Sequence, residues 1–136
     1  MNPALVVEEP GLFTSVQDLG RVGSQRFGIP VSGALDPVAL ALANIVAGND
    51  RRTAGLEMAL MGPTLAVEAD SVRVAVAGGE TSILILGGSA EGRLIPAHES
   101  LTLSRGDRFR VSAVTGTSVA YLAVAGGFAL TPFLGS

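Results

Sequence analysis

The chain has 136 residues, of which 48% are hydrophobic and 15% are charged, and its formal net charge is −3. A chain of this length is expected to form one domain, and its apolar composition excludes an intrinsically disordered protein. The sequence has no cysteine, no lysine and one histidine, which excludes disulfide scaffolds, thiol and Schiff-base chemistry, and a metal site built on histidine or cysteine.

The first predicted element is a strand at residues 5–8, and the next clear one is a helix. Asp36 is a good N-cap, and Pro37 stands at the first helical position, where its missing N–H costs nothing. An apolar run extends to Ala47, and Gly48 can adopt the left-handed conformation that ends a helix. Because the short helix Pro37–Ala47 is apolar nearly all round, we expect it to be buried on more than one side.

After the helix, short apolar runs separated by glycine and proline predict a series of strands. Valines alternate with other residues in the run 72–76, which is typical of a strand with one wetter face. In the run 108–111, Phe109 and Val111 are expected to point inward and the two arginines outward. Strands at this spacing indicate a mainly β fold, as in a barrel. They are expected at residues 56–60, 64–68, 72–76, 83–86, 93–95, 101–103, 108–111 and 119–125, with 83–86 and 93–95 as a hairpin.

The pentapeptide Ala-Val-Ala-Gly-Gly occurs at residues 75–79 and again at residues 123–127. The two copies could be equivalent edges of a barrel left by an internal duplication. Chance repetition in a chain rich in Ala, Val and Gly is the favoured interpretation.

The densest polar segment, residues 14–37, is rich in glycine. A glycine-hinged loop offers backbone N–H groups to an anion, and arginine can clamp a carboxylate or phosphate through two hydrogen bonds. Asp18 or Asp36 can take or orient a proton. In the structural alternative, Asp36 is only a helix cap, and Asp18 and Arg21 pair with each other to hold the loop. The polar side chains of this segment include Gln17, Asp18, Arg21, Gln25, Arg26, Ser32 and Asp36.

Three further polar residues, outside this segment, are considered as site candidates. Glu57, inside an apolar strand, either faces solvent or is a buried carboxylate with a partner such as an arginine. Asn44, inside the apolar helix, is either a satisfied buried amide or a ligand contact, with the first favoured. His98, in a loop, is expected at the surface.

Several partners are not expected. No basic cluster exceeds Arg51 and Arg52, so nucleic-acid binding is not predicted. The longest apolar run, residues 38–47, is far shorter than the ~20 residues of a membrane span. The N-terminal residues are acidic and carry no signal of secretion, so we expect a cytoplasmic protein.

The blocks at residues 11–21 and 28–36, with Asn44 and Asn49, resemble the opening of a known family. It is the family of allophanate hydrolase subunit 2 and of the 5-oxoprolinase C subunit, also called the biotin-dependent carboxyltransferase family. Similarity continues through Glu57, 62–64, 105–107 and 121–127. The resemblance implies a cyclophilin-like β-barrel domain over residues 1–136, and the chain is expected to match the N-terminal half of a longer architecture.

The resemblance also implies a complex with a subunit 1 or B-type protein, and with a further protein of the A type. It implies ATP-dependent opening of 5-oxoproline to glutamate, or carboxyl transfer from carboxybiotin to urea, or a non-catalytic regulatory role. ATP is expected to be used by the complex, and biotin to be on a separate carrier, since this chain has no lysine. The isolated chain is expected to be inactive.

Combining the polar segment with the resemblance, we expect Arg21 to clamp an anion. The catalytic candidates are Asp18, Arg21 and Glu57, and the substrate-binding candidates are Gln17, Gly20, Ser32, Gly33 and Asn44.

Overall fold

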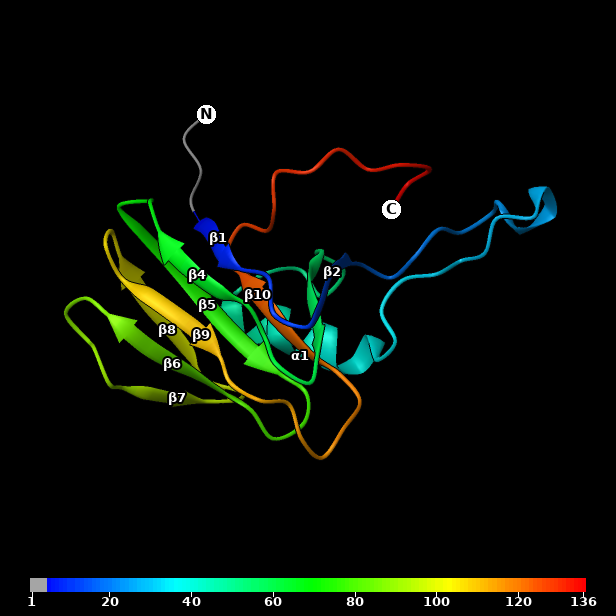
Figure 1. The fold of residues 1–136 in the computed structure, drawn as a ribbon. Coiled ribbons are helices and arrows are strands. Elements are labelled where there is room, and N and C mark those ends of the chain that lie inside the picture. The colour runs from blue at the N-terminus through cyan, green and yellow to red at the C-terminus, as the bar shows by residue number, and fades with distance from the viewer. Residues whose placement is uncertain (1–4) are drawn as a thin grey trace.

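The computed structural model describes residues 5–136, and within this range ten strands form two five-stranded antiparallel sheets (Figure 1). The mainly β fold with one short α-helix is therefore confirmed. Sheet 1 has the order β1 (Leu5–Glu9), β4 (Thr64–Val67), β9 (Arg108–Val111), β6 (Ser82–Gly87) and β7 (Leu94–Pro96). Sheet 2 has the order β2 (Phe13–Gln17), β3 (Gly55–Ala59), β10 (Ala120–Val124), β5 (Ser71–Ala77) and β8 (Ser100–Ser104).

The strands do not close into the expected barrel. Among the described residues, no strand of sheet 1 pairs with a strand of sheet 2. β1 and β2 follow each other in the chain, but the turn at Gly11, with φ of 77°, carries the chain from one sheet to the other. At the opposite edge, β7 has only three residues and ends in Pro96, which has no N–H to donate to a further strand.

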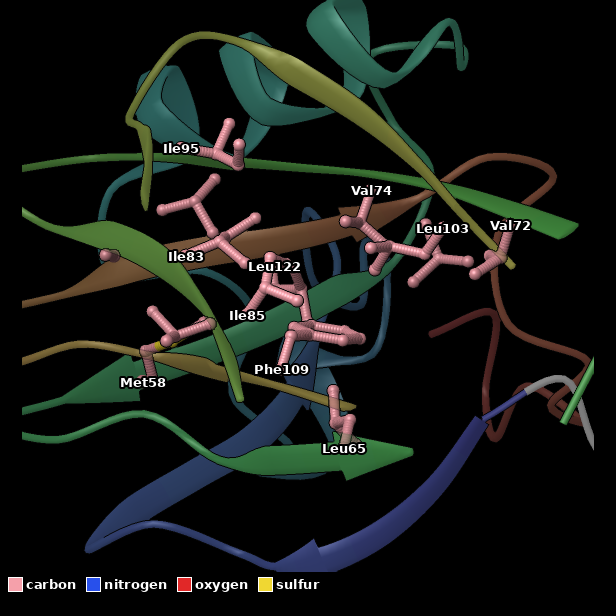
Figure 2. Packing of buried hydrophobic residues seen from close by; sticks show 14 of the residues in the cluster. Met58, Leu65, Val72, Val74, Ile83, Ile85, Ile95, Leu103, Phe109 and Leu122 are labelled. Atoms are coloured by element: carbon pink, nitrogen blue, oxygen red, sulfur yellow. The ribbon is translucent and has the colours of Figure 1, made fainter. Parts of the chain in front are cut away.

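The core lies between the two sheets, as Figure 2 shows. Ile85 and Phe109 from sheet 1 pack in the same cluster as Val74 and Leu122 from sheet 2. Burial of such side chains stabilises the fold by roughly 25 cal/mol per Å² of apolar surface removed from water. The predicted orientation of β9 is confirmed, because Phe109 and its neighbour on the same face, Val111, are buried.

Helix α1 (Pro37–Ala47) begins and ends as predicted. The Oδ1 atom of Asp36 accepts a hydrogen bond of 3.1 Å from the backbone N–H of Ala39, and Gly48 has φ of 92°. Leu40 and Ala43 pack with Ala75 and Tyr121 on the outer face of sheet 2.

The prediction that this helix is buried on more than one side is wrong. Val38 and Ile45 are 78% and 60% exposed, and Leu42 is exposed as well. The helix lies over a single sheet, which covers only the face formed by Ala39, Leu40, Ala43, Asn44 and Ala47.

The two copies of the pentapeptide are neighbours rather than edges. β5 and β10 pair in the interior of sheet 2, with Ala75 opposite Ala123. Ala75 and Ala77 of the first copy and Ala123 of the second are buried under α1, so these small residues allow the helix to approach the sheet. The interpretation as equivalent barrel edges is therefore wrong.

Most of the other predictions about the strands agree with the structure. The hairpin of β6 and β7 is confirmed by the pairing of Ile83 with Ile95. The alternation in β5 holds for its first half, where Arg73 is exposed; further along, Ala75 and Ala77 are buried because α1 covers them. No helix within residues 5–136 is long and apolar enough to cross a membrane.

Between β2 and α1 the chain forms an extended arm, residues 18–35, which projects away from both sheets (Figure 1). At its tip is a short 3-10 helix, η1 (Gln25–Phe27), which contains no buried residue. Two backbone hydrogen bonds join its outgoing and returning halves, from Arg21 N to Val31 O at 2.6 Å and from Ala34 N to Asp18 O at 2.8 Å.

Candidate functional site

A pocket of about 600 Å³ lies where the arm leaves β2 and meets the C-terminal segment, residues 128–136. Five of the eight predicted site residues line it: Gln17, Asp18, Arg21, Ser32 and Gly33. The order of the chain explains why they converge, because Gln17 ends β2 and the returning half of the arm passes back beside Asp18. We refer to this as the arm pocket.

Asp18 is a half-buried carboxylate at the base of the arm. Its Oδ1 atom accepts hydrogen bonds from Gly20 N at 2.8 Å and from Ser136 Oγ at 2.6 Å. Within the described residues, its Oδ2 atom accepts no hydrogen bond from another group, so one oxygen remains open to a ligand.

Arg21 does not pair with Asp18. Its Nε atom donates to the carbonyl oxygen of Phe133 at 3.4 Å, and its guanidinium lies 5.9 Å from the centre of the Phe133 ring. In the part of the chain that the structure describes, Arg21 makes no salt bridge. The guanidinium is therefore free to bind an anion, and the alternative of an Asp18–Arg21 pair that only holds the loop is wrong.

Gly20 and Gly33 allow the two halves of the arm to touch. A Cβ atom on Gly33 would lie 2.6 Å from Gly20 N, and one on Gly20 would lie 2.5 Å from Val31 O. Both glycines also have positive φ, 91° and 87°, and Ser32 between them has φ of 55°. Such backbone geometry in a non-glycine residue is uncommon and marks Ser32 as held in place by its surroundings.

Gln17 connects the arm pocket to a second group of polar side chains on sheet 2. Its Nε2 atom donates to Ser15 Oγ at 3.1 Å, and Ser15 is paired with Glu57 across β2 and β3. Glu57 does not line the arm pocket. It lines a separate pocket of about 380 Å³, together with Ser15 and apolar residues of β2 and β3.

The partner of Glu57 is a tyrosine rather than an arginine. Its Oε2 atom accepts a hydrogen bond from the Tyr121 hydroxyl at 2.6 Å and another from Leu35 N at 2.8 Å. Burial, and then the hydrogen bond to Glu57, raise the pKa of Tyr121 well above its ordinary value of 10.0. Tyr121 therefore remains a protonated donor, and the carboxylate of Glu57 fastens the end of the arm to sheet 2.

The structure places Asn44 away from both pockets. Its side chain is fully buried in α1, with Nδ2 donating to Thr53 O at 2.6 Å and Oδ1 accepting from Asn49 Nδ2 at 3.1 Å. These bonds satisfy the amide and tie the helix to the loop that follows it. His98 is exposed, as expected.

The remaining lining residues of the arm pocket were not predicted from the sequence as part of a site. Two lining residues come from neighbouring strands and loops, and five come from the C-terminal segment more than 90 residues along the chain. No local pattern marks them, because only the tertiary fold brings them to Asp18. They are Val16, Ala54, Phe128, Leu130, Thr131, Pro132 and Ser136.

Among residues 5–136, no three His, Cys, Asp or Glu side chains gather where they could hold a metal ion. What the arm pocket offers is a free guanidinium, an open carboxylate oxygen and an amide. This set of groups suits a small polar ligand that has both an anionic group and an N–H donor.

Comparison with known proteins shows the same architecture elsewhere. The model of a family described as the carboxyltransferase domain, subdomain A and B, matches residues 27–136. Urea amidolyase of Saccharomyces cerevisiae is 37% identical over 134 residues, which are 98% of this chain and 7% of that protein. The 5-oxoprolinase C subunit of Escherichia coli is 33% identical over 136 residues, covering 97% of this chain and 41% of that protein. The crystal structure of K. lactis urea amidolyase has a TM-score of 0.89 at 38% identity, covering 98% of this chain and 8% of that one.

Proposed function

Because this chain belongs to the carboxyltransferase domain family, subdomain A and B, we propose that it is part of an enzyme acting on a small amide. In the finer form of this proposal, it is a subunit of an ATP-dependent 5-oxoprolinase and works with a subunit 1 or B-type partner. The observation that supports this most strongly is the unpaired guanidinium of Arg21 in the arm pocket, beside Gln17 and Asp18.

The groups of the pocket match the groups of 5-oxoproline. This substrate is a five-membered lactam that carries a carboxylate. Arg21 would bind the carboxylate, since a guanidinium forms paired, charge-assisted hydrogen bonds with such a group. The open Oδ2 atom of Asp18 would accept from the lactam N–H, and the amide of Gln17 would orient the ring.

Opening the lactam adds water at the carbonyl carbon, breaks the C–N bond and delivers a proton to the leaving nitrogen. Asp18 is placed to orient or carry that proton, which is a role that carboxylates commonly fill. This chain has no lysine and no Gly-x-Gly loop of the kind that holds phosphates. We therefore assign the binding of ATP to another protein of the complex.

Carboxyl transfer to urea is the second candidate. It is favoured by the relatives named urea amidolyase, one of which is 37% identical over 98% of this chain. Urea has amide N–H groups but no carboxylate, so Asp18 and Gln17 would contact urea and Arg21 would serve the carboxyl group being transferred. Biotin would be attached to a separate carrier.

A regulatory role is the third candidate. The exposed apolar side chains of α1 and of the arm support it, since exposed apolar surface is typical of proteins that bind a partner. In this case the chain would bind a subunit 1-type protein without taking part in catalysis.

The test is to combine this chain with the B-type and A-type proteins of the same organism and to measure ATP-dependent release of glutamate from 5-oxoproline. Arg21→Ala is expected to lower kcat/KM by roughly 100-fold, the order of effect of removing a charge-assisted anion contact. Arg105→Ala is a matched control, because Arg105 is an exposed arginine that pairs with Asp70 and does not line the arm pocket.

Unchanged turnover by an Arg21→Ala complex that still assembles would contradict the clamp role. Urea-dependent carboxyl transfer without glutamate release would instead support the second candidate. Tight binding of the B-type protein with neither activity would support the third.

A further inference from the structure

The outer part of the arm makes few contacts with the rest of the chain. Figure 1 shows it extending from β2 and α1, and beyond Val31 and Arg21 no backbone hydrogen bond joins its two halves until the turn at η1. Val22 is 87% exposed and Phe27 is 70% exposed. Apolar side chains that are so exposed on a projecting segment do not stabilise the fold of this chain by burial. Their exposure indicates that they bind another surface.

The arm is also positively charged. Its one acidic residue, Asp18, lies at its base, and beyond Asp18 the arm carries two arginines and no acid, although the whole chain has a net charge of −3. The guanidinium of Arg26 lies 4.8 Å from the centre of the Phe27 ring, so cation and ring form one unit at the tip. In the part of the chain that the structure describes, Arg26 makes no salt bridge.

The base of the arm is held by close contacts, whereas its tip is exposed. Gly20 and Gly33 pack backbone against backbone, and the bond from Arg21 N to Val31 O is 2.6 Å. Glu57 holds Leu35 N to sheet 2. A segment held in place at its base loses less conformational entropy on binding than a free loop, so it is suited to insert into a partner.

We propose that the arm docks into the B-type partner protein, with Phe27 entering an apolar socket and Arg26 meeting acidic side chains at its rim. The inference rests on the proposed complex and adds the surface by which this chain binds it. A partner of that chemistry complements both features of the tip, the exposed ring and the unpaired positive charge.

The experiment measures the Kd between the full 136-residue chain and the purified B-type protein of the same organism by calorimetry. Phe27→Ala and Arg26→Ala are compared with Leu94→Ala and Arg93→Ala, an exposed apolar residue and an exposed arginine beside each other at β7. The arm variants are expected to raise Kd about tenfold or more, as loss of an interface anchor does, and the control variants less than about twofold.

Salt provides the second measurement. The affinity of the unaltered chain is expected to fall as salt rises, and Arg26→Ala is expected to weaken that dependence, whereas Arg93→Ala is not. Far-ultraviolet circular dichroism checks that each variant is folded, which is expected because the replaced side chains are exposed.

Equal Kd values for the arm variants and the unaltered chain would overturn the docking role and leave the proposed enzyme complex intact. Absence of glutamate release, with a Kd that still depends on Phe27, would overturn the proposed reaction and support the docking role. Absence of any binding by the unaltered chain would overturn the docking role. Self-association that Phe27→Ala abolishes would overturn it too, in favour of a second copy of this chain.

Discussion

The hydroxyl of Tyr121 donates a 2.6 Å hydrogen bond to Oε2 of Glu57, and it accepts one of 2.9 Å from the backbone N–H of Asp36. Because Glu57 also accepts from Leu35 N, this pair joins the middle of sheet 2 to the end of the arm and the start of α1. The position of the arm pocket therefore depends on a buried hydroxyl.

Replacement of this hydroxyl by hydrogen is expected to destabilise the chain. In Tyr121→Phe the ring still fills its place, but Glu57 loses a donor and Asp36 N loses an acceptor. Leaving such groups unsatisfied costs about 1–3 kcal/mol. The free energy of unfolding in urea measures the loss, and a midpoint equal to that of the unaltered chain would show that water replaces the hydroxyl without cost.

For stability, the negative charge of Glu57 is expected to matter less than its ability to accept hydrogen bonds through Oε2. Glu57→Gln keeps a carbonyl oxygen that can accept from Tyr121 and Leu35 N, so we expect a loss of stability below about 1 kcal/mol. Glu57→Ala removes the acceptor and is expected to cost about 1–3 kcal/mol. If Glu57→Gln is stable but abolishes glutamate release by the complex, then the carboxylate is catalytic.

Stability is expected to fall with rising pH above the ordinary pKa of tyrosine. Burial and the bond to Glu57 raise the pKa of Tyr121 above 10.0, so the unfolded chain releases this proton before the folded chain does. The contribution of protonated Tyr121 to the free energy of unfolding is therefore complete below pH 10 and is lost as the pH rises through the raised pKa. Tyr121→Phe should remove this part of the pH dependence.

The titration itself can be observed directly. Tyr121 is the only tyrosine in the chain, so the ultraviolet absorbance of tyrosinate reports on it alone. We expect the absorbance to appear only together with unfolding. Ionisation near pH 10 in a chain that remains folded would contradict the buried bond to Glu57.

The N-cap of α1 is expected to contribute about 1 kcal/mol to stability. Asp36→Ala removes the acceptor for Ala39 N, whereas Asp36→Asn keeps a side-chain oxygen at the same position. The unfolding midpoint should therefore fall in the first variant and change little in the second. A similar fall in both would mean that the charge at the helix end matters rather than the hydrogen bond.

The contact of Gly20 with Gly33 is expected to keep the arm closed at its base. A methyl group in Gly33→Ala would lie 2.6 Å from Gly20 N, whereas in Gly28→Ala it would meet no atom within 4 Å. Both positions have positive φ, so the backbone strain is similar and only the clash differs. Trypsin cleavage after Arg21 should be faster in Gly33→Ala than in Gly28→Ala, and equal rates would contradict the close contact.

Much of the local structure is evident from the amino-acid sequence. The caps Asp36 and Gly48 define both ends of α1, and the alternation of Phe109 and Val111 defines the inner face of β9. Such signals depend on bonds and steric limits within a few residues, so they hold before any tertiary contact forms. The polar segment is recognisable in the same way, from residue types that lie close together in the chain.

The tertiary structure alone decided which of those residues form a site. It brought Ser136 to Asp18 across 118 residues and Tyr121 to Glu57 across 64, and it separated Glu57 from the arm pocket. It also left one face of α1 exposed, although the sequence of the helix is apolar nearly all round. The physical reason is that sheet order and register depend on the packing of the whole core, which no local pattern contains.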